Sequence, residues 1–178
     1  LSNADVILVS AGIHDIMDPF MAKADEYMLK WGFGRFEDVF FANLADYNLT
    51  ETDLIYYNAD LINALKQNNE TAQANMQQIG EELSAYSNAT IVVQNVYNAI
   101  DTIENLGDLS TKRQQAYTSV CNSVNNNLKP INDIIAGFAA DYSYQVADIH
   151  SGFLGYAYKY TNLADLDLNP TAAGHAWI

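Results

Sequence analysis

The sequence predicts an α/β fold with a parallel sheet, because buried-strand patterns alternate with long helical segments. Short runs of mainly apolar residues occur at 5–10 (DVILVS), 90–94 (TIVVQ) and 144–149 (YQVADI). Such runs are typical of strands that are buried on both faces of a parallel sheet. The segments between them are long enough for helical crossovers. At 178 residues, the chain is expected to form a single domain over residues 1–178.

The segment after the first strand contains one helix with readable boundaries. Asp18-Pro19 is typical of a helix start, and Gly32 is suited to ending it, so we expect a helix over residues 21–31. Residues 35–58 are rich in aromatic and apolar side chains without a clear period. We therefore assign no element to them.

Two longer helices are predicted from apolar residues at helical intervals, over residues 61–83 and 117–138. Pro130 lies inside the second pattern, where it predicts a kink or a short break. Residues 172–178 have the character of the first turns of another helix. Because the sequence starts almost at a strand and stops in a helix, we expect a domain that is incomplete at both ends.

Composition narrows the classes of partner. The 8 Lys and Arg residues against 22 Asp and Glu residues give a net charge of −14, which argues against nucleic acid and anionic lipid. No apolar stretch approaches the roughly 20 residues of a membrane span. Cys121 is the only cysteine, which excludes an intrachain disulfide and a cysteine zinc site. The acidic, lysine-poor composition favours an extracytoplasmic location but leaves the compartment open.

Two polar clusters contain the candidate site residues; the first follows the predicted strand 5–10, and the second lies close to a loop and the start of the helix predicted at residues 172–178. The first cluster contains Gly12, His14 and Asp15, and the second contains Asp165, Asp167 and Asn169. In open α/β sheets, ligands bind beyond the carboxyl ends of the strands, and carboxylates there can orient a base for nucleophilic catalysis. The alternative is that these residues only form turns and cap helices. His14, His150 and His175 lack the spacing of metal ligands, so we expect no metal and no cofactor.

Four segments, taken in order, have the pattern of one hydrolase family. Residues 5–15 resemble a strand that ends in Gly-x-Asn-Asp, residues 88–98 (NATIVVQNVYN) a strand ending in Tyr-Asn, and residues 145–153 the strand after it. Residues 168–175 (LNPTAAGH) resemble a block that normally reads Asp-x-x-His-Pro-(Asn/Thr)-x-x-Gly-(His/Tyr). The chain thus resembles the SGNH/GDSL hydrolases. This implies a three-layer α/β/α sandwich of flavodoxin-like type with a five-stranded parallel sheet, and serine-dependent cleavage of acyl or carbohydrate esters.

The chain departs from this family at the positions that carry the chemistry. The blocks with the nucleophilic serine and the oxyanion glycine are not found, and would lie before Leu1. His14 stands where the family has its oxyanion asparagine, and Asn169 stands where it has the catalytic histidine. The usual aspartate position is Leu166, which leaves Asp165 and Asp167 on either side. By resemblance, Gly12, His14 and Asp15 then belong to the oxyanion and substrate side of the site.

The sequence leaves three functions open. The first is a lipase-like esterase whose nucleophile segment lies outside this chain. The second is a catalytically degenerate domain that binds an ester or carbohydrate ligand, and the third is a structural or interaction domain. We expect His14 and Asn169 to face one pocket, the alternative being that backbone groups satisfy each separately and the pocket has collapsed. We also expect the edge of strand 5–10 to be covered by a missing N-terminal segment or by a second copy of the chain.

Overall fold

The parallel sheet lies at the centre of the topology. The computed structural model describes residues 4–85, 88–101 and 106–178. Its main sheet contains three parallel strands in the order β1-β2-β3, namely β1 (Val6–Val9), β2 (Thr90–Gln94) and β3 (Gln145–Ala147). The predicted parallel α/β sheet and the strand over residues 90–94 are therefore confirmed. The third strand is shorter than predicted, because Asp148 caps a helix that begins at Ile149.

The segment between β1 and β2 is helical for most of its length. It contains α1 (Ile13–Trp31), α2 (Asp38–Phe41), the 3-10 turn η1 (Leu44–Tyr47), α3 (Glu51–Leu65) and α4 (Asn69–Leu83). The helix predicted over residues 21–31 in fact begins at Ile13 and continues through Pro19. Burial of Ile16, Met17 and Phe20 explains this early start, since these side chains share one helical face.

The predicted helix over residues 61–83 is two helices, because residues 66–68 separate α3 from α4. The apolar spacing widens to seven residues between Leu65 and Ala72, which are both buried. Part of the unassigned segment 35–58 belongs to α3, whose start is fixed by Thr50. The hydroxyl of Thr50 accepts a hydrogen bond from the Asp53 N–H, and the Asp53 carboxylate accepts one from the Thr50 N–H.

A single long helix, α5 (Thr111–Tyr142), connects β2 to β3 and follows the 3-10 turn η2 (Leu106–Asp108). Of the two outcomes predicted at Pro130, a kink or a short break, the break is wrong, since α5 runs through this residue without interruption. Burial of Leu128 and Ile131 on both sides of Pro130 holds the two halves in one helix. None of the described helices is both long enough and apolar enough to cross a bilayer.

The chain after β3 forms a small unit of short elements. They are α6 (Ile149–Phe153), α7 (Ala157–Tyr160), β4 (Thr161–Asn162), η3 (Leu163–Asp165), β5 (Asp167–Pro170) and α8 (Ala172–Trp177). Strands β4 and β5 pair antiparallel, separately from the main sheet. The helix predicted at residues 172–178 is confirmed as α8.

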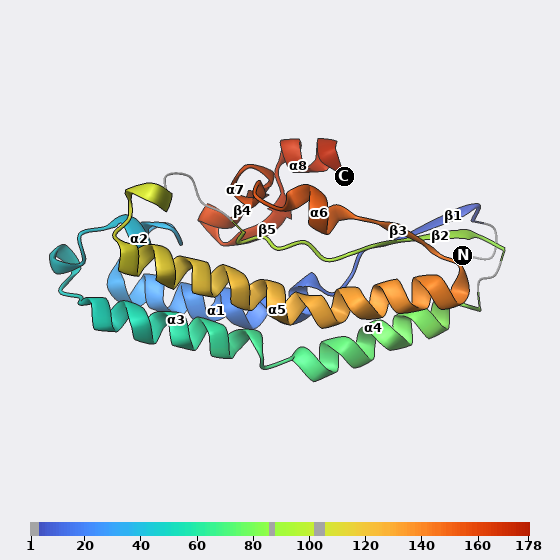
Figure 1. The fold of residues 1–178 in the computed structure, drawn as a ribbon, viewed down its shortest axis with the longest axis horizontal. Helices are drawn as coiled ribbons and strands as arrows, with labels where there is room; N and C mark the ends of the chain where they lie inside the picture. The colour runs from blue at the N-terminus through green and yellow to red at the C-terminus, as the bar shows by residue number, and fades with distance from the viewer. Residues whose placement is uncertain (1–3, 86–87, 102–105) are drawn as a thin grey trace.

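The long helices α1, α3, α4 and α5 lie together on one side of the main sheet (Figure 1). Both crossovers, β1 to β2 and β2 to β3, step in the same direction across the sheet. Because such crossovers are right-handed, they place their helices on the same face. The described residues therefore form a largely helical layer on a three-stranded sheet, and the predicted three-layer sandwich with five strands is not confirmed.

The two faces of the sheet differ in burial. Ile7, Ile91 and Val93 face the helices and are buried. Val6 and Leu8 point to the opposite face, where 59% and 62% of their surface is exposed. Among the described residues no strand pairs with the outer edge of β1. An exposed apolar strand edge favours association with another strand.

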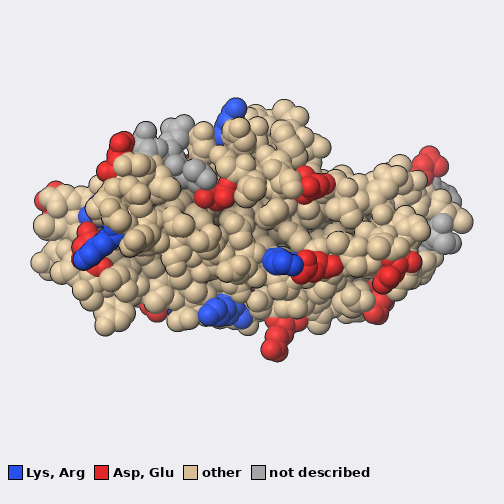
Figure 2. All heavy atoms as spheres, viewed as in Figure 1, with Lys and Arg blue, Asp and Glu red and all other residues tan. Residues whose placement is uncertain are grey.

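The acidic side chains are spread over the surface rather than gathered in one patch on the face in view (Figure 2). Lys and Arg side chains are few on that face, and much of it carries neither charge. On this face, therefore, the excess of acidic residues does not form one charged patch.

We predict that chain 1–178 self-associates through the exposed side of β1. Leu8→Lys places a charge on this strand, so the variant is expected to sediment as a monomer under conditions where the unaltered chain forms dimers or larger species. Leu29→Lys is the matched control, because Leu29 is also largely exposed, at 74% against 62% for Leu8, but lies on α1. A monomeric unaltered chain whose β1 amides exchange freely with solvent would contradict this prediction.

Candidate functional site at the carboxyl edge of the sheet

The carboxyl ends of the three parallel strands meet at one edge of the sheet, as the common strand direction requires. Three segments continue from this edge. Residues 10–12 lead from β1 into α1, residues 95–100 follow β2, and residues 148–150 follow β3. The small C-terminal unit packs against the second of these segments.

Gly12 makes the turn from β1 into α1. Its φ of 99° lies in the left-handed region that side chains other than glycine rarely adopt. A Cβ atom at this position would stand 2.9 Å from Met76 Cε and 3.3 Å from Val96 Cγ2. Both the backbone conformation and the close packing therefore require glycine at this turn.

The segment after β2 is irregular yet buried, and asparagine side chains satisfy its backbone. The Asn132 side chain, on α5, accepts a hydrogen bond from Val96 N (2.8 Å) and donates one to Val96 O (2.9 Å). Asn98 is 2% exposed. Its amide donates to Cys121 O and to Asn125 Oδ1, and its oxygen accepts from Ile100 N. This segment is thereby held in one conformation against α5.

A polar cluster joins the carboxyl ends of β2 and β3. Asn95 Nδ2 donates to Asp148 Oδ1 (2.8 Å), and Asn95 Oδ1 accepts from His150 N (2.8 Å). Asp148 Oδ1 also accepts from Ser151 N at the start of α6 (3.1 Å). The hydrogen bond from Asn95, together with those from Ser151, holds the pKa of the Asp148 carboxyl below its usual range.

His150 has the tautomer that a general base needs. Its Nδ1 lies 3.1 Å from the carbonyl oxygen of Val96, which can only accept a hydrogen bond. Nδ1 therefore carries the proton in the neutral ring, and Nε2 presents its lone pair. Nε2 has no hydrogen-bond partner within the described residues. A half-buried imidazole that a backbone carbonyl orients in this way can accept a proton from a nucleophile.

The C-terminal unit reaches the same segment through Tyr97. The Tyr97 hydroxyl donates to Leu168 O (2.5 Å), and its ring packs on Phe153 with centroids 4.4 Å apart. Burial, with a smaller contribution from the charge of Asp167, raises the pKa of Tyr97 to about 12. Tyr97 therefore stays protonated and keeps this hydrogen bond throughout the neutral range.

The candidate residues predicted from sequence are only partly brought together. A Cβ atom at Gly12 would lie 3.3 Å from Val96 Cγ2, and β5, which carries Asp167 and Asn169, is hydrogen-bonded to Tyr97, so both clusters lie near one segment. Their side chains, however, have separate partners.

His14 is exposed, and its Nδ1 lies 2.8 Å from Asp18 Oδ1, one turn further along α1. Asn169 is exposed, and its amide donates to Asp167 Oδ1 at 2.7 Å. Each is thus satisfied separately, but by a carboxylate and not by the backbone groups that the alternative named. Asp15 is half-buried in the first turn of α1, and Asp165 is exposed in η3.

The cluster of Asn95, Asp148 and His150 was not predicted from the sequence. Asp148 lies at the end of the strand predicted over residues 144–149, and His150 follows that strand directly, which is the same signal that selected the residues after β1. His150 was instead considered only as one of three scattered histidines. The interaction that gives it a base-competent tautomer comes from Val96, 54 residues away, and no local pattern shows it.

Within the described part of the chain, no three His, Cys, Asp or Glu side chains are grouped so that they could hold a metal ion. Comparison of the chain with protein-family models, with curated proteins and with solved structures gave no match. The likeness to the SGNH/GDSL hydrolases therefore depends on the sequence segments given above.

We predict that Gly12→Ala destabilises the fold by about 1–3 kcal/mol, because alanine is strained at this φ and its Cβ presses on Met76. Urea unfolding measures the loss. Gly34→Ala is the control, since an added Cβ there has no atom within 4 Å. Equal stability of the two variants would show that the turn at residue 12 is not constrained.

We predict that Asp148→Asn flattens the decline of stability in acid. A carboxyl whose pKa is lower in the folded than in the unfolded state stabilises the fold above its unfolded pKa of about 3.9. That contribution is lost as the pH falls through the lower, folded pKa. Urea unfolding at pH 7, 5, 3 and 2 should therefore show a smaller fall for Asp148→Asn than for Asp165→Asn, which changes the net charge equally. Parallel curves for the two variants would contradict the assignment.

Proposed function

We propose that this chain is part of a serine ester hydrolase of the SGNH/GDSL type, acting on acyl or carbohydrate esters, with its nucleophilic serine on a segment outside residues 1–178. The observation that carries the proposal is His150, an oriented imidazole with a free Nε2 at the carboxyl edge of a parallel sheet. The order of strands along the sheet and the glycine turn after β1 agree with the resemblance in sequence.

In this proposal His150 takes the role that Asn169 cannot fill, since an amide has no titratable proton near neutral pH. Nε2 accepts the serine proton as the hydroxyl oxygen attacks the ester carbonyl. The same proton then goes to the leaving alkoxide, which departs as an alcohol and leaves an acyl-serine. Nε2 then takes a proton from a water molecule as that water attacks the acyl carbonyl, and it returns the proton to the serine oxygen as the C–O bond breaks and the acid leaves. The Val96 carbonyl keeps the ring in position throughout.

A second candidate function is ligand binding without turnover, and Asn169 is the observation that favours it. Its side chain is tied to Asp167 and leaves no base at the position where the family has one. In that case the edge of the sheet binds an ester or a carbohydrate but does not cleave it. The presence or absence of an activated serine separates the two functions.

We predict that chain 1–178 alone hydrolyses p-nitrophenyl acetate no faster than a denatured sample, because no serine nucleophile block occurs in it. Saturable turnover that survives repurification and is lost in Ser10→Ala or His14→Ala would overturn this prediction and assign the chemistry to the start of α1.

The decisive experiment uses the complete gene product from its natural source. We expect a fluorophosphonate probe to label one serine outside residues 1–178, and His150→Gln to lower labelling and esterase kcat by about 10²–10⁴ without unfolding the protein. The control His175→Gln changes an exposed histidine on α8 and should leave both unchanged. An unlabelled gene product that still binds an ester or carbohydrate would favour the second function.

A further inference from the structure

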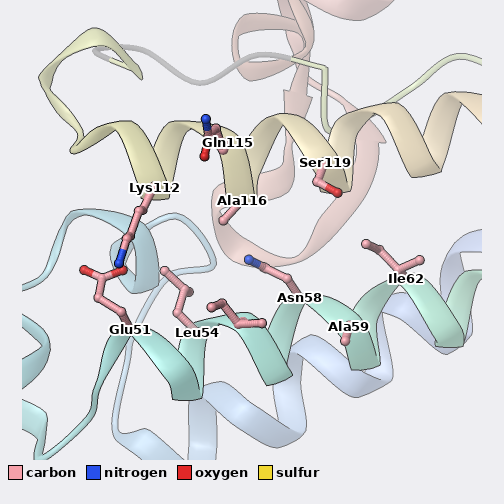
Figure 3. A pocket seen from close by; sticks show the side chains of 10 residues that line it. Glu51, Leu54, Asn58, Ala59, Ile62, Lys112, Gln115, Ala116 and Ser119 are labelled. Atoms are coloured by element: carbon pink, nitrogen blue, oxygen red, sulfur yellow. The ribbon is translucent and has the colours of Figure 1, made fainter.

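A cavity of about 420 Å³ lies between α3 and α5, on the helical layer. Both helices contribute apolar side chains to its lining, namely Leu54, Ile55, Ala59 and Ile62 from α3 and Ala116 from α5. In Figure 3, Ala116 and Ile62 are directed into the space between the two helices. The volume falls in the range of small-molecule sites.

Most polar residues of the lining lie at its border. Glu51 and Lys112, of opposite charge, are at one end of the cavity (Figure 3). Gln115 and Ser119 are exposed residues of α5. A ligand that enters beyond this border therefore meets mainly apolar surface.

Asn58 is the exception, because it is polar, lines the cavity and is only 6% exposed. Figure 3 shows its amide nitrogen directed from α3 towards α5, into the cavity. Nδ2 has no hydrogen-bond partner within the described residues. On the other side of the amide, Oδ1 is buried away from the cavity and has no partner there either. The cavity thus holds one unused N–H donor.

Two other buried asparagines of this chain show the contrast. Asn127 is 7% exposed, and its Oδ1 accepts from Asn69 Nδ2 while its Nδ2 donates to Ser123 O. Asn98 likewise uses both ends of its amide. An amide without partners is less favourable in such a place than an apolar side chain, so packing does not account for Asn58. A single polar group that converges on an apolar pocket is instead typical of a group that orients a ligand.

We propose that this cavity binds an uncharged small molecule with an apolar body and a carbonyl oxygen, which accepts a hydrogen bond from Asn58 Nδ2. A charged ligand is disfavoured, because the apolar side chains cannot replace its water. This inference does not depend on the proposed ester hydrolysis, since it concerns the helical layer.

The test compares 1-indanone with indole, two fused bicyclic molecules of similar size. 1-Indanone has a carbonyl acceptor and no donor, whereas indole has an N–H donor and no carbonyl. Titration of chain 1–178, followed by amide NMR, should move the signals of residues 54–62 and 115–119. We expect 1-indanone to bind about fivefold to tenfold more tightly than indole, as one additional hydrogen bond implies. It should also move the side-chain amide protons of Asn58 downfield, which tests the contact without any substitution.

Three variants complete the experiment. Asn58→Leu removes the donor and should abolish the preference for 1-indanone. Asn63→Leu is the matched control, because Asn63 is exposed on the same helix and does not line the cavity, and it should keep the preference. Ala116→Phe fills the cavity from α5 and should abolish binding of both compounds.

Four results would overturn the proposal. They are the absence of shifts at these residues at the highest soluble concentration of 1-indanone, equal or tighter binding of indole, a preference for 1-indanone that persists in Asn58→Leu, and binding that survives Ala116→Phe. Where Asn58→Leu fails to fold, the Asn58 amide signal decides, since a signal that does not move downfield with 1-indanone excludes the hydrogen bond.

Discussion

The fold depends on satisfying the backbone of the irregular segment after β2. Residues 95–100 are largely buried, so their N–H and C=O groups cannot be left to water. Asn132 pairs with both backbone groups of Val96, as a neighbouring strand would, and Asn98 fixes the next turn against α5. His150 and Leu168 are hydrogen-bonded to this segment, and a Cβ atom at Gly12 would lie 3.3 Å from its Val96. The segment therefore positions His150 and β5 at the carboxyl edge of the sheet.

Local sequence patterns were sufficient where one pattern dominated. The run at 90–94 had a single interpretation, and β2 has those bounds. The run at residues 61–83 was compatible with either one helix or two. The apolar residues of α3 and α4 are buried in one core, and their helical periodicity continues across residues 66–68. The break predicted at Pro130 was wrong because tertiary packing also acts there. Packing of the side chains around it favours one continuous helix over the break that proline alone predicts.

The candidate site was harder to predict, because its geometry comes from contacts between distant segments. The proximity of strand ends follows from parallel pairing alone, and that part of the prediction needed no tertiary detail. The orientation of His150 depends on Val96, and that of Asn95 on Asp148, at separations of more than fifty residues. His14 and Asn169, chosen by position within motifs, instead have local carboxylate partners. The position of residues within motifs therefore indicated the region of the candidate site but not His150, Asn95 and Asp148, which form its polar cluster.

The single thiol allows the contact between α5 and residues 95–100 to be followed by the rate of thiol modification. Cys121 lies on the buried side of α5, its Sγ is directed at the Ile100 carbonyl, and burial raises its pKa to about 12. A thiol reagent can reach it only when the helix separates from that segment. The rate at which a thiol reagent modifies Cys121 under native conditions therefore reports how often α5 separates locally from residues 95–100.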